Sequence, residues 1–388
     1  MAATFWLYSH NFTHSGAPLV LAAIARELAA SGLREQLRIV SWGGLHDQRH
    51  STLQHQLAAE GIHCQVLNPE QPPPKIKPGD RLLLNTVALP DPVMQQALAW
   101  LAEGKLQQLD WYAHESDPQI WIQNDATRCL IAEALCSGRL QMRVPSQRVR
   151  LAYEQWLGFA GQELDVQCPA LEYSSVFEGV KPAKQGHFES LRLVLVGAAG
   201  SGNKGHLWLL QLLEAALSDV PNDARGLRPI QLSFLGLETG QYAALSRQVI
   251  RRAESLLGDQ FSWYESCLRD KVLSKMSESN LLANCSLKEA FSCVSAEAMA
   301  MGLPLLRLQN GGYEEQLIDG VTGFDLGSPS PEIRPETLQL INRLRDPKRV
   351  PESKLLEMAS SAQSHAEWFS TINYGDWLLS PGSIKVPS

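Results

Sequence analysis

Two glutamates, Glu289 and Glu297, have the residue type and the spacing that most strongly suggest chemistry in this sequence. A polar loop carries Glu289. Eight positions later, Glu297 lies in a run of good helix formers that should begin near Cys293, with Ser292 as the N-cap. At such a strand-to-helix turn, the free backbone N–H groups of the helix favour a negatively charged oxygen. A carboxylate beside them accepts hydrogen bonds from the hydroxyls of a diol, such as a ribose or a hexose.

Two further motifs follow the second glutamate in a fixed order. The helix continues as AMAMGLP over residues 298–304, and Glu314-Glu315 precedes the turn DGVTG at residues 319–323. The glutamate pair and these landmarks together resemble the donor-site signature of the retaining glycosyltransferases of family GT4. Without the landmarks, the two glutamates are explained equally well as solvated helix residues.

The resemblance implies a role for each residue of this segment. Glu297 is expected to hold the ribose of a nucleotide, and Glu289 to contact the donor sugar as a catalytic residue. The backbone at Phe291, Ser292 and Cys293 is expected to bind the diphosphate at the helix N-terminus. The sequence departs from the family at residues 290–292, where Ala-Phe-Ser replaces the usual Gly-Phe-Gly. Two Cβ atoms are thereby added where the backbone approaches the ligand, which can alter the choice of donor.

A glycine-rich loop, GAAGSGNKG at residues 197–205, follows a very apolar segment. Backbone N–H groups in such a loop, ahead of a helix, can cradle phosphate. The pattern is not a P-loop, because Gly205 follows Lys204 where a P-loop has Ser or Thr. It resembles the Gly-Arg…Lys-Gly loop of GT4, which implies that Gly197 and Lys204 bind the donor phosphates and that Lys204 assists catalysis. Ala198 stands in place of the Arg. The alternative for Lys204 is a solvated loop lysine.

Two residues of the first half complete the candidate set. Gly16 opens the first helix and permits close approach of the backbone; in GT4 a glycine-containing turn here borders the donor phosphate and the acceptor. An ordinary strand-to-helix turn explains Gly16 equally well. His114 ends a predicted strand, and His114-Glu115 resembles the His-Glu pair that GT4 members carry there. We expect His114 to contact the transferred sugar as a catalytic residue, the alternative being a buried histidine with satisfied hydrogen bonds.

The composition argues against several classes of protein. A net charge of −7 and an isoelectric point of about 5.8 disfavour nucleic acid as the main partner. Seven scattered cysteines without a Cys-x-x-Cys motif indicate reduced thiols rather than disulfides or a zinc site. The sequence has no Asp-x-Asp motif for a divalent cation, no signal-peptide pattern and no apolar run of about 18 residues. We therefore expect no metal, no cofactor and no membrane span, with peripheral membrane contact left open.

Strand-like and helix-like segments alternate along the chain, which indicates parallel α/β layers. Two domains are expected at 388 residues. A polar stretch containing Gly and Pro, residues 176–190, is the predicted linker. It separates an acceptor-side domain over residues 1–175 from a donor-binding domain over residues 191–362. A terminal helix over residues 363–380 is predicted to pack back on the first domain. The resemblance implies the GT-B fold, with two Rossmann-like α/β domains facing each other across a cleft.

These features predict a cytoplasmic, metal-independent, retaining glycosyltransferase. The expected donor is a nucleoside diphosphate sugar, with UDP preferred over GDP or ADP. The expected acceptor is a hydroxyl of a glycan, lipid or protein, as in polysaccharide biosynthesis. One alternative is another GT-B enzyme, such as a nucleotide-sugar epimerase. The other is a non-catalytic sugar-binding or scaffold protein on a degraded GT-B fold, which Ala198 and the Ala-Phe-Ser segment favour.

Overall fold

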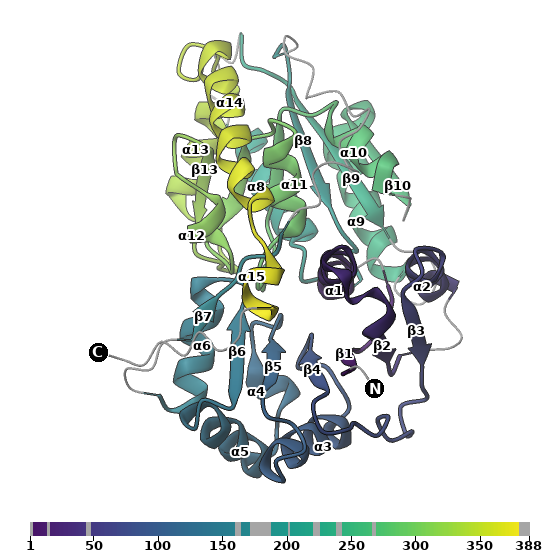
Figure 1. Cartoon of the computed structure of the whole chain (residues 1–388). Coiled ribbons are helices and arrows are strands. Elements are labelled where there is room, and N and C mark those ends of the chain that lie inside the picture. The colour runs from purple at the N-terminus through teal and green to yellow at the C-terminus, as the bar shows by residue number, and fades with distance from the viewer. Residues whose placement is uncertain are drawn as a thin grey trace. The chain divides into compact units, whose positions relative to one another are not determined.

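The structure is a computed structural model (Figure 1). It describes residues 3–13, 16–43, 48–159, 164–170, 188–200, 202–219, 226–237, 243–265 and 269–379. The chain divides into two compact units, Met1–Ala170 with Ile372–Ser388, and Leu171–Thr371. Most of the predicted linker over residues 176–190 lies outside the described residues.

The first unit is built on a sheet of seven strands, all of which pair in parallel, in the order β3-β2-β1-β4-β5-β6-β7. Its strands are β1 (Phe5–Ser9), β2 (Leu37–Ser41), β3 (His63–Val66), β4 (Arg81–Leu84), β5 (Leu109–Tyr112), β6 (Leu140–Val144) and β7 (Asp165–Val166). Its helices are α1 (Gly16–Leu28), α2 (Gln48–Ala59), α3 (Asp91–Ala102), α4 (Pro118–Trp121), α5 (Asp125–Cys136), α6 (Gln147–Leu157) and α15 (Tyr374–Leu378). Central strands such as β5 are buried throughout, as a parallel sheet covered on both faces requires.

Helix α1 is a strongly apolar element whose Leu21, Ile24 and Leu28 are buried in the core of the first unit. Among the described residues, the stretch Gly16–Gln36 is the one candidate long and apolar enough to cross a membrane, and half of its most apolar window is buried inside the protein. Gly32, with φ of +92°, interrupts the helical path. We attribute the apolar character of this stretch to its place in the core.

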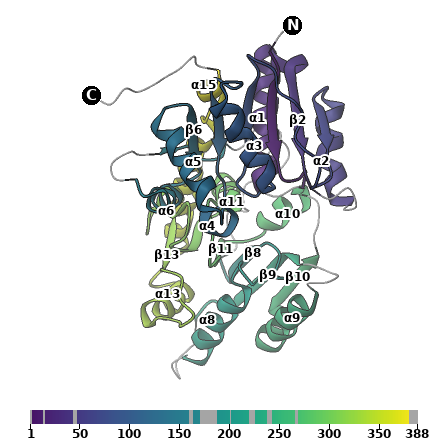
Figure 2. The same ribbon diagram turned by 90° about the horizontal axis from the view of Figure 1, so that it is seen from below.

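The second unit has a sheet of six strands, also paired in parallel, in the order β10-β9-β8-β11-β12-β13. Its strands are β8 (Leu191–Val196), β9 (Ile230–Leu237), β10 (Phe261–Glu265), β11 (Leu281–Asn284), β12 (Leu305–Leu308) and β13 (Gly323–Gly327). Its helices are α8 (His206–Ser218), α9 (Ala243–Leu257), α10 (Arg269–Met276), α11 (Cys293–Ala300), α12 (Tyr313–Gln316), α13 (Pro335–Arg345) and α14 (Glu352–Ser370). Figure 2 shows α8 and α9 beside strands β8 to β10.

The strand order of each sheet reverses at one point, which we call the switch point of the sheet. In the second unit the chain leaves β8 for β9 and β10 on one side, and then returns to build β11, β12 and β13 on the other. In the first unit β1 likewise lies between β2 and β4. The loops that follow the two strands flanking such a point diverge, and ligands of open α/β sheets bind in the crevice between them. In the second unit, this places the loops after β8 and β11 at the expected ligand position.

The terminal helix predicted over residues 363–380 requires a correction. Helix α14 ends at Ser370 in the second unit, and α15 is a separate helix in the first unit. The break occurs at Asn373, whose side chain accepts hydrogen bonds from the N–H groups of Gly375 and Asp376 and thereby caps α15. Because an Asn cap starts a new helix, the aromatic residues on both sides belong to two elements rather than one.

Candidate functional site

Two loops of the second unit are joined at the switch point of its sheet. One loop is residues 197–205, between β8 and α8, and the other is residues 285–292, between β11 and α11. Asn203 links them, because its side-chain amide donates to the carbonyl of Lys288 at 2.8 Å and accepts from its N–H at 2.9 Å. The N–H of Leu287 also donates to the Asn203 carbonyl at 2.8 Å. No sequence pattern predicts this link, since Asn in a glycine-rich loop is usually a turn residue.

One glycine makes this close approach of the loops possible, and a second one shapes the first loop. Gly205 has φ of +73°, and a Cβ there would lie 2.0 Å from the carbonyl oxygen of Cys285. Gly197 has φ of +139°, and a Cβ there would lie 3.0 Å from Cγ of Lys204. At Gly205 an added Cβ would overlap the backbone of the other loop, so only glycine fits. At Gly197 the positive φ favours glycine, and an added Cβ would crowd the Lys204 side chain. The aliphatic part of Lys204 therefore packs directly over the backbone of Gly197.

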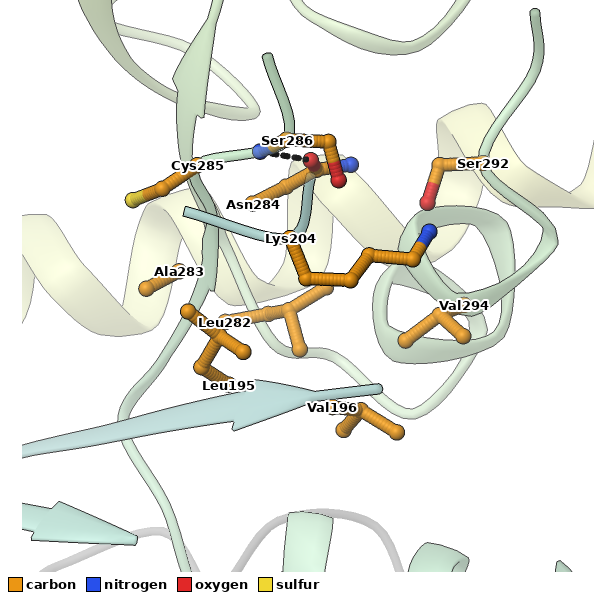
Figure 3. A pocket seen from close by; sticks show the side chains of 10 residues that line it. All are labelled: Leu195, Val196, Lys204, Leu282, Ala283, Asn284, Cys285, Ser286, Ser292 and Val294. Carbon is orange, nitrogen blue, oxygen red and sulfur yellow. Dashed lines mark hydrogen bonds between the residues drawn. The ribbon is translucent and has the colours of Figure 1, made fainter. Parts of the chain in front are cut away.

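Lys204 and Glu289, two predicted catalytic residues, form an ion pair. The Nζ atom of Lys204 lies 2.9 Å from Oε2 of Glu289. The exposed fractions of the two side chains are 34% and 15%, so both remain accessible from solvent. Figure 3 shows the Lys204 side chain extending toward Ser292, at the start of α11.

Glu297 lies one turn into α11 and is nearly buried, with an exposed fraction of 7%. Its Oε1 atom lies 2.5 Å from the guanidinium of Arg269, the first residue of α10. Burial raises the pKa of the Glu297 carboxyl, and the charge and hydrogen bond of Arg269 oppose that rise. Arg269 was not among the residues predicted from the sequence, because 28 positions separate it from Glu297 and it belongs to no recognised motif.

The N-terminus of α11 has the capping predicted from the sequence. Ser292 is the N-cap and accepts a hydrogen bond from the N–H of Ser295 at 3.2 Å, and the helix begins at Cys293. Burial, followed by the negative fields of Glu297 and Glu289, raises the pKa of the Cys293 thiol to about 12, which keeps it uncharged. The ring of Phe291 packs edge-on against that of Phe369. The side chain of Phe291 is thus buried in packing against α14.

A buried cation lies beneath the loop of residues 285–292. Arg307 on β12 is fully buried, and its guanidinium donates to the side chains of Gln316 and Asn310 and to the carbonyl of Gly311. These partners in turn hold the loop at three points: Gln316 Nε2 to the Ser292 carbonyl at 2.8 Å, Asn310 Nδ2 to the Ser286 carbonyl at 2.8 Å, and the Gly311 N–H to the Glu289 carbonyl at 3.0 Å. The position of the loop is thus fixed from the sheet side.

A small cavity of about 20 Å³ opens between the two loops (Figure 3). Its polar lining comes from Lys204, Asn284, Ser286 and Ser292, and its apolar lining includes Val294 and residues of β8 and β11. This volume holds about one water molecule. The cavity marks where the loop after β8 meets the start of α11.

The first unit places His114 just after β5. Its Nε2 atom lies 3.2 Å from Oδ1 of Asn85, whose Nδ2 donates to the Ala17 carbonyl at 2.8 Å. Because that carbonyl can only accept, Oδ1 of Asn85 must face the ring, and Nε2 of His114 carries the proton. Burial and the positive field of His10 lower the pKa of His114 to about 3, so the ring is neutral at physiological pH.

Glu115, the neighbour of His114, is held by the loop that follows β4. Its carboxylate accepts hydrogen bonds from the hydroxyl of Thr86 and from the N–H of Val87, the latter at 3.0 Å. Burial raises the pKa of this carboxyl, and the two hydrogen bonds oppose the rise. The contacts are those of a residue that orients a neighbouring loop.

Gly16 is the first residue of α1, and no atom lies within 4 Å of a Cβ built on it. Packing within the first unit therefore does not require glycine here. His14, a further loop histidine, lies outside the described residues. In the part of the chain that the structure describes, no group of three or more His, Cys, Asp or Glu side chains could hold a metal ion.

Part of the second unit is similar to a known protein family. The model of the glycosyl transferases group 1 family matches residues 190–341. Residues 190–341 are therefore similar to the glycosyl transferases group 1 family. The D-inositol 3-phosphate glycosyltransferase of Gordonia bronchialis is 29% identical over 178 residues, which cover 46% of this chain and 37% of that relative. The chain thus matches little more than a third of the relative's length.

Solved structures match the chain over nearly its whole length. Anabaena HepE in complex with UDP-glucose is 16% identical, with a TM-score of 0.64, and the match covers 95% of this chain and 97% of HepE. A glycosyltransferase from Rickettsia africae is 14% identical, with a TM-score of 0.68 and coverage of 96% and 95%. The predicted GT-B fold with two Rossmann-like domains is confirmed, and so is the resemblance to GT4-like glycosyltransferases. The segment that this family model matches contains all the predicted site residues except Gly16 and His114.

Proposed function

We propose that this chain is a retaining glycosyltransferase that moves a sugar from a nucleoside diphosphate donor to a hydroxyl of a glycan, lipid or protein. The observation that carries the proposal is the ion pair between Lys204 and Glu289 at the switch point of the sheet of the second unit. A cation for a diphosphate and a carboxylate for a sugar hydroxyl are thereby held on adjoining loops. HepE, with the same fold, binds UDP and glucose, which supports UDP as the preferred nucleotide over GDP or ADP.

Each polar group of the site has a distinct task in this proposal. Glu297 accepts hydrogen bonds from the ribose, and the backbone N–H groups at the start of α11 meet the diphosphate. Lys204 neutralises the charge that grows on the diphosphate as the glycosidic bond breaks. Its ammonium has three N–H donors, so it can bind a phosphate oxygen while still bonded to Glu289. Glu289 then orients the transferred sugar.

We propose a front-face displacement in which the leaving phosphate assists the incoming hydroxyl. The site residues of the second unit supply one cation on the loop after β8, together with the N–H groups at the start of α11. The reaction is therefore proposed to need no metal and no cofactor. His114 is proposed to donate a hydrogen bond to the transferred sugar, and Gly16 to border the acceptor. The protein is proposed to work in the cytoplasm, with peripheral contact with a membrane where the acceptor is a lipid.

Ala198 favours one competing function. Since GT4 loops carry Arg at this position, its loss leaves Lys204 as the single basic residue of the loop at 197–205. A degraded, non-catalytic sugar-binding or scaffold protein would tolerate that loss. A nucleotide-sugar epimerase is the other alternative on the same fold.

The deciding experiment measures the release of free nucleoside diphosphate from UDP-glucose, with and without a panel of glycan and lipid acceptors. Acceptor-dependent release of UDP is expected from a transferase. An epimerase would instead release UDP without an acceptor or change the sugar. A thermal-shift panel of UDP, GDP and ADP identifies the nucleotide, since a ligand at 100 times its Kd stabilises the folded state by about 2.7 kcal/mol. Absence of any shift, together with no release, would support the non-catalytic alternative.

A further inference from the structure

Arg269 touches the carboxylate of Glu297, although no motif in the sequence points to it. Its guanidinium lies 2.5 Å from Oε1, and the exposed fractions of the Arg269 and Glu297 side chains are 35% and 9%. No other hydrogen bond to the Glu297 carboxylate is found among the described residues. One oxygen is therefore anchored, while Oε2 retains its capacity to accept hydrogen bonds.

Other charged groups lie around this pair. The Cys293 thiol, one turn earlier on α11, feels the fields of Glu297, Glu289, Arg269 and Lys204, which places all four charges around the start of the helix. Helix α11 packs on β11, β12 and α14. The titratable groups of those elements are Arg307 on β12, and Glu352, Lys354, Glu357, His365 and Glu367 on α14. Arg269 is the charged group that acts on the ionisation of Glu297.

Building on the function proposed above, we propose that Arg269 is a positioning residue that fixes Oε1 of Glu297, so that Oε2 is presented to the ribose hydroxyls as an ionised acceptor. Binding of both ribose hydroxyls requires a cation such as Arg269 that keeps the Glu297 carboxylate ionised. A carboxylate can accept from both ribose hydroxyls, whereas a protonated carboxyl turns one of its oxygens into a donor. Glu297 is buried enough that removal of the neighbouring cation favours the protonated form. Arg269, from a different helix, would therefore decide both the direction and the charge of the nucleotide-binding carboxylate.

The test is calorimetric binding of UDP to wild type and to the variants Arg269→Gln and Arg269→Lys, from about pH 6 to about pH 9. Arg269→Gln should weaken binding by roughly tenfold or more at neutral pH, as for loss of one charge-assisted hydrogen-bond partner. Its affinity relative to wild type should then rise with pH as the Glu297 carboxyl ionises, because the ionisation of the UDP phosphate affects both proteins alike. Arg269→Lys keeps the charge and should restore most of the affinity.

Two controls separate positioning from general damage. Arg252→Gln removes a guanidinium of equal exposure that pairs with Glu214 at 2.6 Å in the same unit, and it should leave UDP binding unchanged. In a Glu297→Gln background, Arg269→Gln should add no pH dependence. Wild-type-like affinity of Arg269→Gln at every pH would overturn the inference alone. A wild type that binds no nucleoside diphosphate would overturn the proposed function, and the inference with it.

Discussion

The carbonyl oxygen of Glu289 accepts a hydrogen bond from the backbone N–H of Gly311, 3.0 Å away. A Cβ on Gly311 would lie 2.0 Å from that same oxygen and 2.5 Å from the carbonyl oxygen of Ala290. The loop that carries the proposed sugar carboxylate is thus in direct backbone contact with the turn after β12. The position of Glu289 depends on a residue 22 positions further along the chain.

Gly311→Ala should therefore move the Glu289 loop as well as lower the stability. Overpacking against backbone costs about 1–3 kcal/mol, measurable as the free energy of unfolding in urea. Donor affinity of the folded protein should fall at the same time. Gly16→Ala is the matched control, since no atom lies within 4 Å of the added Cβ. Unchanged stability of Gly311→Ala would mean that the two loops separate freely. If Gly16→Ala keeps its stability but loses donor binding, the proposed closeness of Gly16 to a ligand gains support.

Glu297→Ala should lose most of the nucleotide affinity without unfolding the protein. A hydrogen bond from a hydroxyl to a carboxylate contributes about 1.5–3 kcal/mol, or about ten- to a hundredfold in Kd. Calorimetry with UDP and GDP measures the change. Glu214→Ala, which removes an exposed ion-paired glutamate of the same unit, should bind normally. Unaltered binding by Glu297→Ala would show that this face of α11 does not meet the nucleotide.

Lys204→Ala should nearly abolish transfer while changing the affinity for a nucleoside monophosphate little. Losing one preorganised charge partner of the leaving group typically lowers the rate by about 10²- to 10³-fold. Initial rates with UDP-glucose and an acceptor give the comparison, with Lys275→Ala as a control for a lysine paired on the surface at Glu278. Ala198→Arg is expected to raise activity or donor affinity by restoring a second cation. A Lys204→Ala variant with an unchanged initial rate would favour the non-catalytic alternative.

His114→Gln should lower turnover much more than nucleotide affinity and should also change the pH dependence of stability. The pKa of His114 lies near 3 in the folded protein, below its usual value near 6.5, so the unfolded chain binds the extra proton between these values. Wild-type stability should therefore fall as the pH drops through this window, and the fall should be smaller in His114→Gln. Melting temperatures from about pH 7 down to about pH 4.5 test this. If the melting temperature falls with pH equally in both proteins, a group other than His114 is responsible for the fall.

Activity should survive an excess of EDTA, since Lys204 and helix N–H groups are proposed to meet the diphosphate charge. The assay compares initial rates before and after chelation. A complete loss that Mn²⁺ or Mg²⁺ restores would contradict the metal-independent site.

The sequence predicted those parts of the molecule that depend on neighbouring residues. Ser292 as N-cap and Cys293 as the start of α11 are confirmed, because capping chemistry is local. The strand over residues 323–327 and the helix over 125–136 were not predicted from the sequence. The segment at 323–327 begins and ends with glycine, and glycine is depleted in strands. At 125–136, Asp, Thr, Arg and Glu interrupt the apolar pattern, although Asn124 is a good N-cap.

Contacts between distant segments could not be predicted in the same way. Arg269 meets Glu297, and Asn85 meets His114, only once the sheet order has brought separate loops together. No periodicity or spacing in the sequence predicts these two contacts. The residue types of the site were therefore visible in the sequence, while the partners that orient them were not.

The two ion pairs, Lys204 with Glu289 and Arg269 with Glu297, give four charges that sum to zero around the start of α11. A balanced cluster of this kind projects little field into solvent, and the whole chain is acidic. An anionic donor would then not be drawn in from a distance, and its association rate would depend only weakly on ionic strength. Attraction would begin at contact, when a phosphate oxygen joins Glu289 in accepting a hydrogen bond from the Lys204 ammonium.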